Sequence, residues 1–355
     1  MNNPTSFLDT TVAYQIDSLN IAGFLRDFSN QIERAQVDFN KLDLPDYSKV
    51  REVVFCGMGG SGIGGEIASD LPAEWILKPI TLCRDYNLPA FVSTSTLVVL
   101  VSFSGDTEEV LSCYKQAERL GAQIFIITSG GKLWDLAQDK KIPNYKFDYN
   151  SPPRDALGYL FTPLLSLMAK AGVLLEEKIN LVPAITELKK LQIEVDIKIP
   201  TADNQAKKIA YSIFDHLPVV VGSSLTKGVA RRLKSQFNEH SKAIASFEVL
   251  PELNHNMIEG FSHPARFNDD LFIILIKNTF DHPEVLKRLE IFTEFLKNKH
   301  IFCEAIEPRG VDFWSQKLCS VLIGDWVSYY LAMLNRVDPG PIPAISGLKN
   351  KLRGI

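Results

Sequence analysis

A glycine-rich loop near residue 60 has the residue types that could hold a phosphate group. Residues 53 to 71 read VVFCGMGGSGIGGEIASDL, in which an apolar run leads through glycines into a helix-like stretch. The amides at the start of a helix attract anions. Gly57, Gly59 and Gly62 have the spacing of a dinucleotide fingerprint, but the next apolar run, ending in Cys83-Arg84-Asp85, supplies no convincing acid for a ribose. The loop alone therefore leaves the kind of phosphate open.

A second loop, VSFSGDTEEVL, places three hydroxyls between an apolar run and a helical pattern. Ser102, Ser104 and Thr107 could converge there on one dianion, together with Gly60 and Ser61 of the first loop. Serine and threonine are also common helix caps, so Thr107 could serve only to begin the helix. Two such loops on neighbouring strands favour a cage for a single phosphate.

The cysteines and histidines show no spacing typical of a metal site. The five cysteines occur singly, which fits small buried residues in a reducing compartment better than disulfides or zinc ligands. No two of the six histidines are four residues apart. We therefore expect a reaction without a metal and without a cofactor.

The two loops need a parallel sheet to position them. Short apolar runs at 53–57, 80–84, 96–104, 123–130 and 145–149 alternate with helical patterns, notably at 107–120 and 132–139. Strands that are apolar on both faces and alternate with helices are typical of a doubly wound parallel sheet. Residues 17–43 precede it with the apolar spacing of an amphipathic helix.

The same pattern occurs again in the second half of the chain. Residues 217–237 repeat the order of strand, Gly/Ser turn and helix, and 270–278 and 300–307 correspond to 96–104 and 123–130. A long helix is predicted at 313–334. The expected fold class is α/β, with two doubly wound domains of the same strand order, parallel sheets and flanking helices. The expected divisions are an N-terminal helical segment (1–44), a first, phosphate-binding domain (45–155), a helical connector (156–194) and a second domain with a C-terminal helix and tail (195–355).

The composition of the chain is typical of a folded protein and argues against nucleic-acid-binding and membrane-spanning proteins. The chain has 355 residues, 46% of them apolar and 23% charged, as expected of a folded protein with more than one domain. A net charge of -4 argues against a nucleic-acid partner. The N-terminal residues do not have the pattern of a signal peptide, and no apolar run is long enough to span a membrane. A cytoplasmic location is expected.

Five motifs together resemble a known enzyme family. GGSG followed by SFSGDTEEVL resembles the SIS (sugar isomerase) domain. Three further stretches resemble the bifunctional phosphoglucose/phosphomannose isomerases, and the five occur in the family's order between about residues 50 and 352: PPRDALGYLF (152–161), QFNEHSK (236–242) and LPELNHNMIEGF (250–261). The resemblance implies two SIS domains and interconversion of glucose 6-phosphate and mannose 6-phosphate with fructose 6-phosphate. It also implies metal-free proton transfer through a cis-enediol(ate).

The resemblance also implies roles for four side chains. Glu239 matches the family's base, and Arg154 could stabilise the negative charge of the enediolate. His255 would open the sugar ring from the neighbouring subunit, which implies a homodimer with a shared active site. Lys349 resembles the C-terminal lysine that contacts sugar oxygens, and Lys351 is close enough in sequence to take that role instead.

Use of mannose 6-phosphate is connected in this family with a small hydroxyl residue near the C-terminus. This chain has no threonine after Thr293, so Gly340 or Ser346 would have to leave the necessary room.

Two other functions compete with the isomerase. A non-catalytic SIS-type sugar-phosphate-binding regulator would keep the hydroxyl cage but would not need Glu239, Arg154 and His255. A nicotinamide-dependent oxidoreductase would depend on the glycine loop alone.

Overall fold

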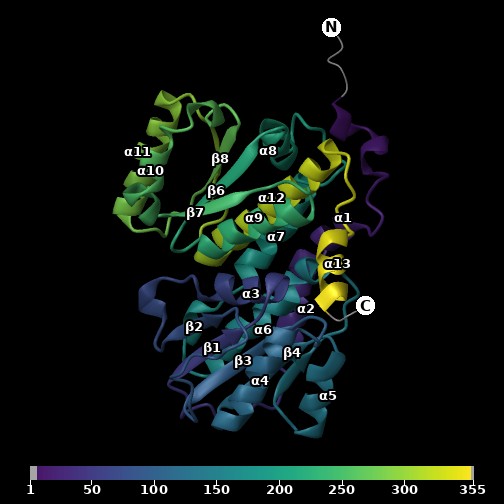
Figure 1. Cartoon of the computed structure of the whole chain (residues 1–355), viewed down its shortest axis with the longest axis vertical. Helices are drawn as coiled ribbons and strands as arrows, with labels where there is room; N and C mark the ends of the chain where they lie inside the picture. Colours follow the sequence, from purple (N-terminus) through teal and green to yellow (C-terminus); the bar gives the residue numbers. More distant parts are fainter. Residues whose placement is uncertain (1–5, 353–355) are drawn as a thin grey trace.

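The computed structural model describes residues 6–352 and contains one parallel β-sheet in each half of the chain (Figure 1). The first sheet has the order β2-β1-β3-β4-β5. Its strands are β1 (Glu52–Cys56), β2 (Ile80–Cys83), β3 (Thr96–Ser102), β4 (Gln123–Thr128) and β5 (Asn144–Lys146). All its pairings are parallel, because a helix or a long connection separates consecutive strands.

The second sheet repeats this order in four strands, β7-β6-β8-β9. Its strands are β6 (Leu217–Ser223), β7 (Ser246–Leu250), β8 (Leu271–Ile276) and β9 (Phe302–Ile306). The predicted duplication is therefore confirmed. β7 was not predicted as a strand. Its position at the sheet edge leaves three of its five residues only partly buried, so its apolar signal is weak.

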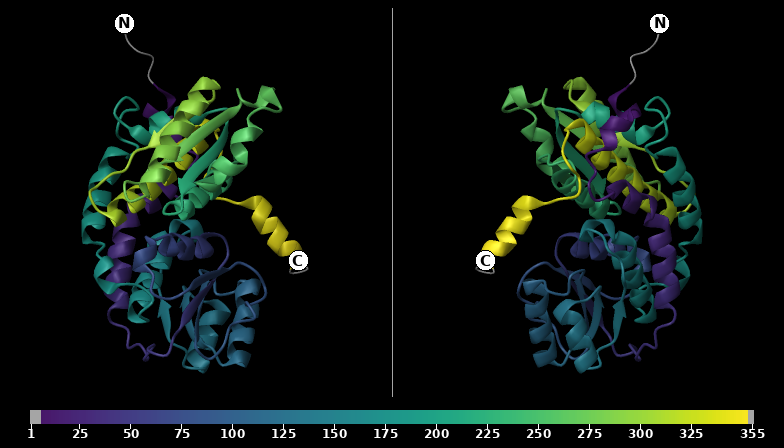
Figure 2. Two further views of the ribbon diagram at one scale, coloured as in Figure 1. Left: turned by 90° about the vertical axis from the view of Figure 1, so that its left-hand side faces the viewer. Right: turned by 90° about the vertical axis from the view of Figure 1, so that its right-hand side faces the viewer.

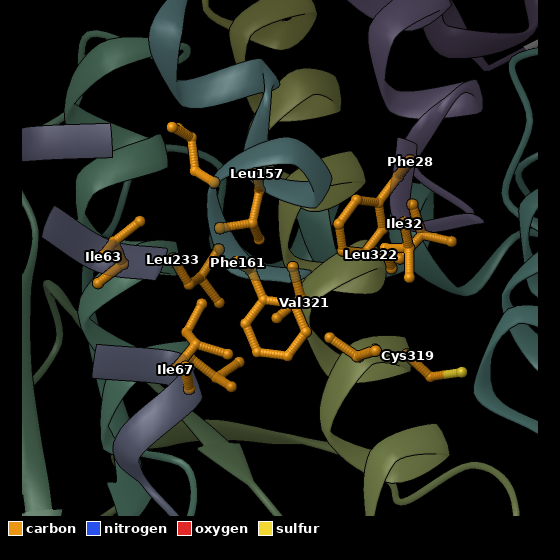
Figure 3. Packing of buried hydrophobic residues seen from close by; sticks show 14 of the residues in the cluster. Phe28, Ile32, Ile63, Ile67, Leu157, Phe161, Leu233, Cys319, Val321 and Leu322 are labelled. Atoms are coloured by element: carbon orange, nitrogen blue, oxygen red, sulfur yellow. The ribbon is translucent and has the colours of Figure 1, made fainter. Parts of the chain in front are cut away.

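Helices between the two sheets join the halves through one continuous apolar core (Figure 3). This core includes residues from four different helices, namely Ile63, Ile67, Phe161, Leu233 and Leu322. The helices of the chain are α1 (Ile21–Arg26), α2 (Phe28–Phe39), α3 (Gly59–Ser69), α4 (Glu108–Leu120), α5 (Gly131–Asp139), α6 (Leu157–Lys170), α7 (Val182–Glu194), α8 (Gln205–Ile213), α9 (Lys227–Glu239), α10 (Met257–Gly260), α11 (Pro283–Asn298), α12 (Phe313–Leu334) and α13 (Pro343–Leu352).

The register of the first sheet brings the two predicted phosphate loops together. Cys56, the last residue of β1, pairs with Leu100 of β3, so these strands end side by side. β3 can occupy the centre because all seven of its residues are apolar or hydrogen-bonded and buried. Helices α3 and α4 therefore begin at the same edge of the sheet.

The C-terminal helices differ sharply in burial. α12 is almost entirely buried in the core, as its apolar sequence predicts. α13 has no buried residue, and Figure 2 shows it leaving the second half of the molecule toward the first. Such a helix gains little from packing within the chain.

The α/β class, the parallel sheets and the flanking helices agree with the prediction. The stretch at 17–43 differs, because it forms two helices that meet at Asp27. Asp17 fixes the start of α1 by accepting hydrogen bonds from the amides of Ile21 and Ala22. In the described chain, no helix combines the length and apolarity needed to cross a bilayer.

Candidate active site

The first phosphate loop packs directly against the backbone of Arg154. A Cβ added at Gly60 would lie only 2.9 Å from the Arg154 amide nitrogen, so any side chain here would push the two segments apart. The next residue, Ser61, accepts a hydrogen bond from the Phe103 amide at 3.1 Å through its Oγ. That bond ties the first loop to the second and leaves the Ser61 hydroxyl proton available to an anion.

The second loop is held by its own hydroxyls. Ser102 Oγ lies 2.8 Å from Thr107 Oγ1 and accepts a hydrogen bond from the Gly105 amide at 3.0 Å. Gly105 has a φ of +72°, which favours glycine. Thr107 occupies the N-cap position of α4, but its side chain makes no capping hydrogen bond. The interpretation of Thr107 as only a helix cap is therefore not supported.

These loops form one wall of a cleft of about 340 Å³. Four of the five predicted phosphate-binding residues line it, namely Gly60, Ser61, Ser104 and Thr107. Ser102 does not line it and is fully buried, so the structure shows it orienting Thr107. Because α3 and α4 both begin at this wall, their N-termini add positive potential to the cleft.

Arg154 and Glu239 meet beside the first loop, where the two halves of the chain come together. Arg154 Nη1 lies 3.5 Å from Glu239 Oε2, and both residues line the cleft. Arg154 follows Pro153 in a short 3-10 helix, whereas Glu239 is the last residue of α9. The guanidinium also donates hydrogen bonds to the carbonyls of Pro339 and Gly340, at 2.7 and 2.6 Å.

A buried network behind this pair fixes both residues. Asp155 and His240 directly follow Arg154 and Glu239, and Asp155 Oδ1 lies 3.2 Å from His240 Nε2. The other ring nitrogen of His240 lies 3.0 Å from Ser328 Oγ. Burial alone would raise the pKa of Asp155, but the charges of His240 and the neighbouring arginines outweigh it and lower that pKa.

A second buried ion pair, between Arg232 and Asp325, supports the backbone of Arg154. Arg232 donates hydrogen bonds to both carboxylate oxygens of Asp325, at 2.9 and 2.7 Å, and another to the carbonyl of Arg154 at 2.9 Å. The backbone of Arg154 is therefore held from α9. Burial raises the pKa of Asp325 although the charge of Arg232 opposes that shift.

The two remaining predicted catalytic residues lie in different surroundings. Lys349 and Ile345 of α13 line the cleft together with Ile342, which directly precedes that helix, whereas Lys351 does not line it. His255 ends a short 3-10 helix of the second half, is exposed, and is not among the residues lining the cleft. Within one chain the structure therefore brings together Arg154, Glu239 and Lys349, but not His255.

Sequence reasoning did not single out several residues that line the cleft. Tyr86 follows β2 and its hydroxyl lies 3.5 Å from Glu108 Oε2. Others are Met58, Phe103, Asp106 and Glu108. Their positions at strand ends beside the two loops were the available signal. Neither Gly340 nor Ser346, which were considered for mannose recognition, lines this cleft.

One cluster of possible metal ligands exists in the described chain, outside the cleft. The sulfurs of Cys56, Cys83 and Cys113 lie within 4.8 Å of one another, and all three residues are buried. Cys56 and Cys83 are paired on adjacent strands, and Cys113 comes from α4. Linear spacing could not reveal this cluster because the sheet brings the three residues together.

Comparison with known proteins gives consistent similarities. The sequence model of the family described as "Bacterial phospho-glucose isomerase C-terminal SIS domain" matches residues 202–352. A bifunctional phosphoglucose/phosphomannose isomerase of Caldicellulosiruptor bescii is 36% identical over 307 residues, covering 86% of this chain and 91% of the relative. One from Aquifex aeolicus is 34% identical, covering 89% of this chain and 96% of the relative.

Solved structures extend the similarity of fold. The crystal structure of a glucose-6-phosphate isomerase like protein from Thermus thermophilus matches with a TM-score of 0.64, covering 94% of this chain and 98% of that one. At 18% sequence identity, this match concerns the fold alone.

Proposed function

Since this chain belongs to the bifunctional phosphoglucose/phosphomannose isomerase family, we propose that it interconverts glucose 6-phosphate and mannose 6-phosphate with fructose 6-phosphate. One observation carries the proposal for the site. Arg154 and Glu239, contributed by the two halves of the chain, meet 3.5 Å apart in a cleft that the hydroxyl and glycine loops also line.

The phosphate of the substrate would be held by Ser61, Ser104 and Thr107. Their hydroxyls can donate to phosphate oxygens, and the N-termini of α3 and α4 favour a dianion in the same place. This anchor fixes the far end of the sugar, so that binding energy from the phosphate orients the reacting carbons.

Proton transfer would belong to Glu239. Its carboxylate would remove the proton from C2 of the open-chain aldose, which gives the enediolate with its negative charge on O1. The same carboxylate would return that proton to C1 while the hydroxyl proton on O2 passes to O1, which gives the ketose. Arg154 would stabilise the negative charge on the enediolate oxygen, and as a guanidinium it stays charged throughout. The two carbonyls that accept from Arg154 hold its fork in place, so little reorganisation is needed.

Ring opening would require a second copy of the chain. We place His255 of a partner subunit at the cleft in a homodimer, because His255 is exposed and lies outside the cleft of its own chain. Imidazole can protonate the ring oxygen near neutral pH. Lys349 would contact the sugar oxygens from α13.

The deciding experiment is a coupled assay of fructose 6-phosphate formation from each aldose, with EDTA present, on wild type and Glu239→Gln. We expect turnover that survives the chelator and falls by at least about 100-fold in the variant, while sugar-phosphate binding persists. A well-folded wild type that binds a sugar phosphate but turns over neither aldose would contradict the proposal and favour a regulator.

A further inference from the structure

A second cavity of about 190 Å³ adjoins the catalytic cleft. Gly59, Gly60, Arg154 and Glu239 line both spaces, so the proposed proton-transfer pair stands at their common wall. The cavity lies where α3 of the first half faces α9 and β7 of the second.

The walls of this cavity are strongly basic. Glu239 is the one acid among the described residues that line it, whereas five basic residues do so: Arg84, Arg154, Arg231, Arg232 and Lys234. Asp325 neutralises Arg232 from behind. Arg84 and Arg231, by contrast, share the single buried carboxylate of Glu66.

The acidic groups therefore do not balance the positive charge near Arg231 and Lys234. Lys234 forms no ion pair with any residue in the part of the chain that the structure describes. Both residues lie on α9 and are partly exposed to the cavity. An anion entering here would meet cations whose charge is not cancelled locally.

Arg231 is also held in a fixed orientation. Its Nε donates to Glu66 Oε1 at 3.2 Å, and the guanidinium carbon lies 4.6 Å from the centre of the Phe247 ring. The carboxylate and the ring hold the guanidinium from two sides, while its terminal nitrogens donate no hydrogen bond to residues 6–352. A guanidinium placed in this way suits bidentate binding of a phosphate.

We propose that this cavity is a second anion-binding subsite, through which the chain binds aldohexose 1,6-bisphosphates as inhibitors. One phosphate would occupy the loops of Ser61 and Thr107, and a phosphate on C1 would contact Arg231 and Lys234. The orientation depends on the proposed function, because Glu239 must reach C1 and C2 and thereby places C1 beside the common wall. In an aldose, a phosphate ester at C1 blocks the anomeric centre and prevents ring opening, so such a ligand binds without reacting.

Isothermal titration calorimetry on the full chain with glucose 1,6-bisphosphate and with glucose 6-phosphate tests this subsite. Wild type should bind the bisphosphate at least about 10-fold more tightly. Lys234→Gln should weaken bisphosphate binding by about 10-fold and glucose 6-phosphate binding by less than about 2-fold. The exposed Lys287 of α11 supplies a charge-matched control, Lys287→Gln, which should change neither affinity.

Arg231→Gln should repeat the selective loss, but it removes one partner of the buried Glu66 and needs a check by thermal unfolding. Lys234→Gln breaks no ion pair, so it tests the subsite even if Arg231→Gln unfolds. Equal weakening of both ligands in Lys234→Gln would overturn the subsite, as would a bisphosphate that binds no more tightly than glucose 6-phosphate. Calorimetry needs no turnover, so a failed isomerase assay beside Lys234-dependent bisphosphate binding would reject only the reaction.

Discussion

His240 Nε2 lies 3.2 Å from Asp155 Oδ1, and neither side chain is exposed. Each of these residues follows a proposed catalytic residue in the sequence: Asp155 follows Arg154, and His240 follows Glu239. One residue of each dipeptide faces the cleft and the other is locked in the core. The buried pair therefore fixes the distance between the two side chains to which the reaction is assigned, Arg154 and Glu239.

Asp155→Asn should impair catalysis more than substrate binding. The amide keeps the shape but loses the charge that faces His240 and Arg154, so the pair at the cleft should shift. We expect kcat to fall by about 10- to 100-fold, with KM changed by less than about 3-fold, and the free energy of unfolding to fall by about 3 kcal/mol. Steady-state kinetics and urea unfolding measure these effects, with the exposed Asp46→Asn as control. A purely structural role would lower stability and leave kcat per folded molecule unchanged.

Substitutions in the hydroxyl loops should act mainly on KM. Ser61→Ala and Thr107→Val each remove a donor for the phosphate dianion, and a hydrogen bond to a charged group contributes about 1.5–3 kcal/mol. KM for glucose 6-phosphate should therefore rise by about 10- to 100-fold. Thr107→Ser keeps the hydroxyl, so its KM should stay close to that of wild type. Unchanged KM in Ser61→Ala would place the phosphate elsewhere.

Gly60→Ala tests the close approach between the first loop and Arg154. The added Cβ would lie 2.9 Å from the Arg154 amide nitrogen, so Arg154 would have to move. We expect kcat/KM to fall by at least about 10-fold, because small displacements of a catalytic group are costly. Gly347→Ala is the matched control, since nothing lies within 4 Å of a Cβ there. Full activity in Gly60→Ala would show that the loop can relax without moving Arg154.

The fold could be predicted from the sequence because its strands are buried on both faces and carry unbroken apolar runs. β3 is the clearest case, since all seven of its residues are buried. β7 was missed because an edge strand is only partly buried and alternates less clearly. The break between α1 and α2 was missed because helical spacing continues through Asp27.

For the site, the sequence predicted individual residues but not the contacts between distant segments. Loop motifs located Gly60, Ser61, Ser104 and Thr107, and the family resemblance located Arg154 and Glu239. The basic cavity could not be predicted, because Arg84 and Arg231 are far apart in sequence and meet only through the buried Glu66. Nor could the buried Asp155–His240 pair, since its distance depends on how the two halves pack.

The choice between Lys349 and Lys351 is testable on α13. Lys349 lines the cleft and Lys351 does not, although both are exposed in the last turns of the same helix. Lys349→Ala should lower kcat/KM by about 10-fold through loss of a charged contact to the sugar. Lys351→Ala should stay within about 2-fold of wild type. A larger loss of kcat/KM in Lys351→Ala than in Lys349→Ala would assign the sugar contact to Lys351.

Lys317 of α12 should make stability depend on pH in the alkaline range. It is fully buried, and its ammonium donates to the carbonyl of Asp70. Burial lowers the pKa of Lys317 to about 8, although the charges of Asp70 and Asp281 oppose this shift. Below about pH 8 the folded chain bears the cost of a buried charge.

Between that value and the ordinary lysine pKa of 10.5 the folded state holds fewer protons than the unfolded state, so this residue's cost to stability is relieved as pH rises. Lys317→Met should remove this residue's contribution to the pH dependence. The difference in unfolding free energy between wild type and variant should change by about 3 kcal/mol from pH 7 to 10.5. Urea unfolding at several pH values measures it, with Lys287→Met as the exposed control. Parallel plots of unfolding free energy against pH for wild type and Lys317→Met would contradict the prediction, because they would mean that Lys317 titrates alike in the folded and unfolded states.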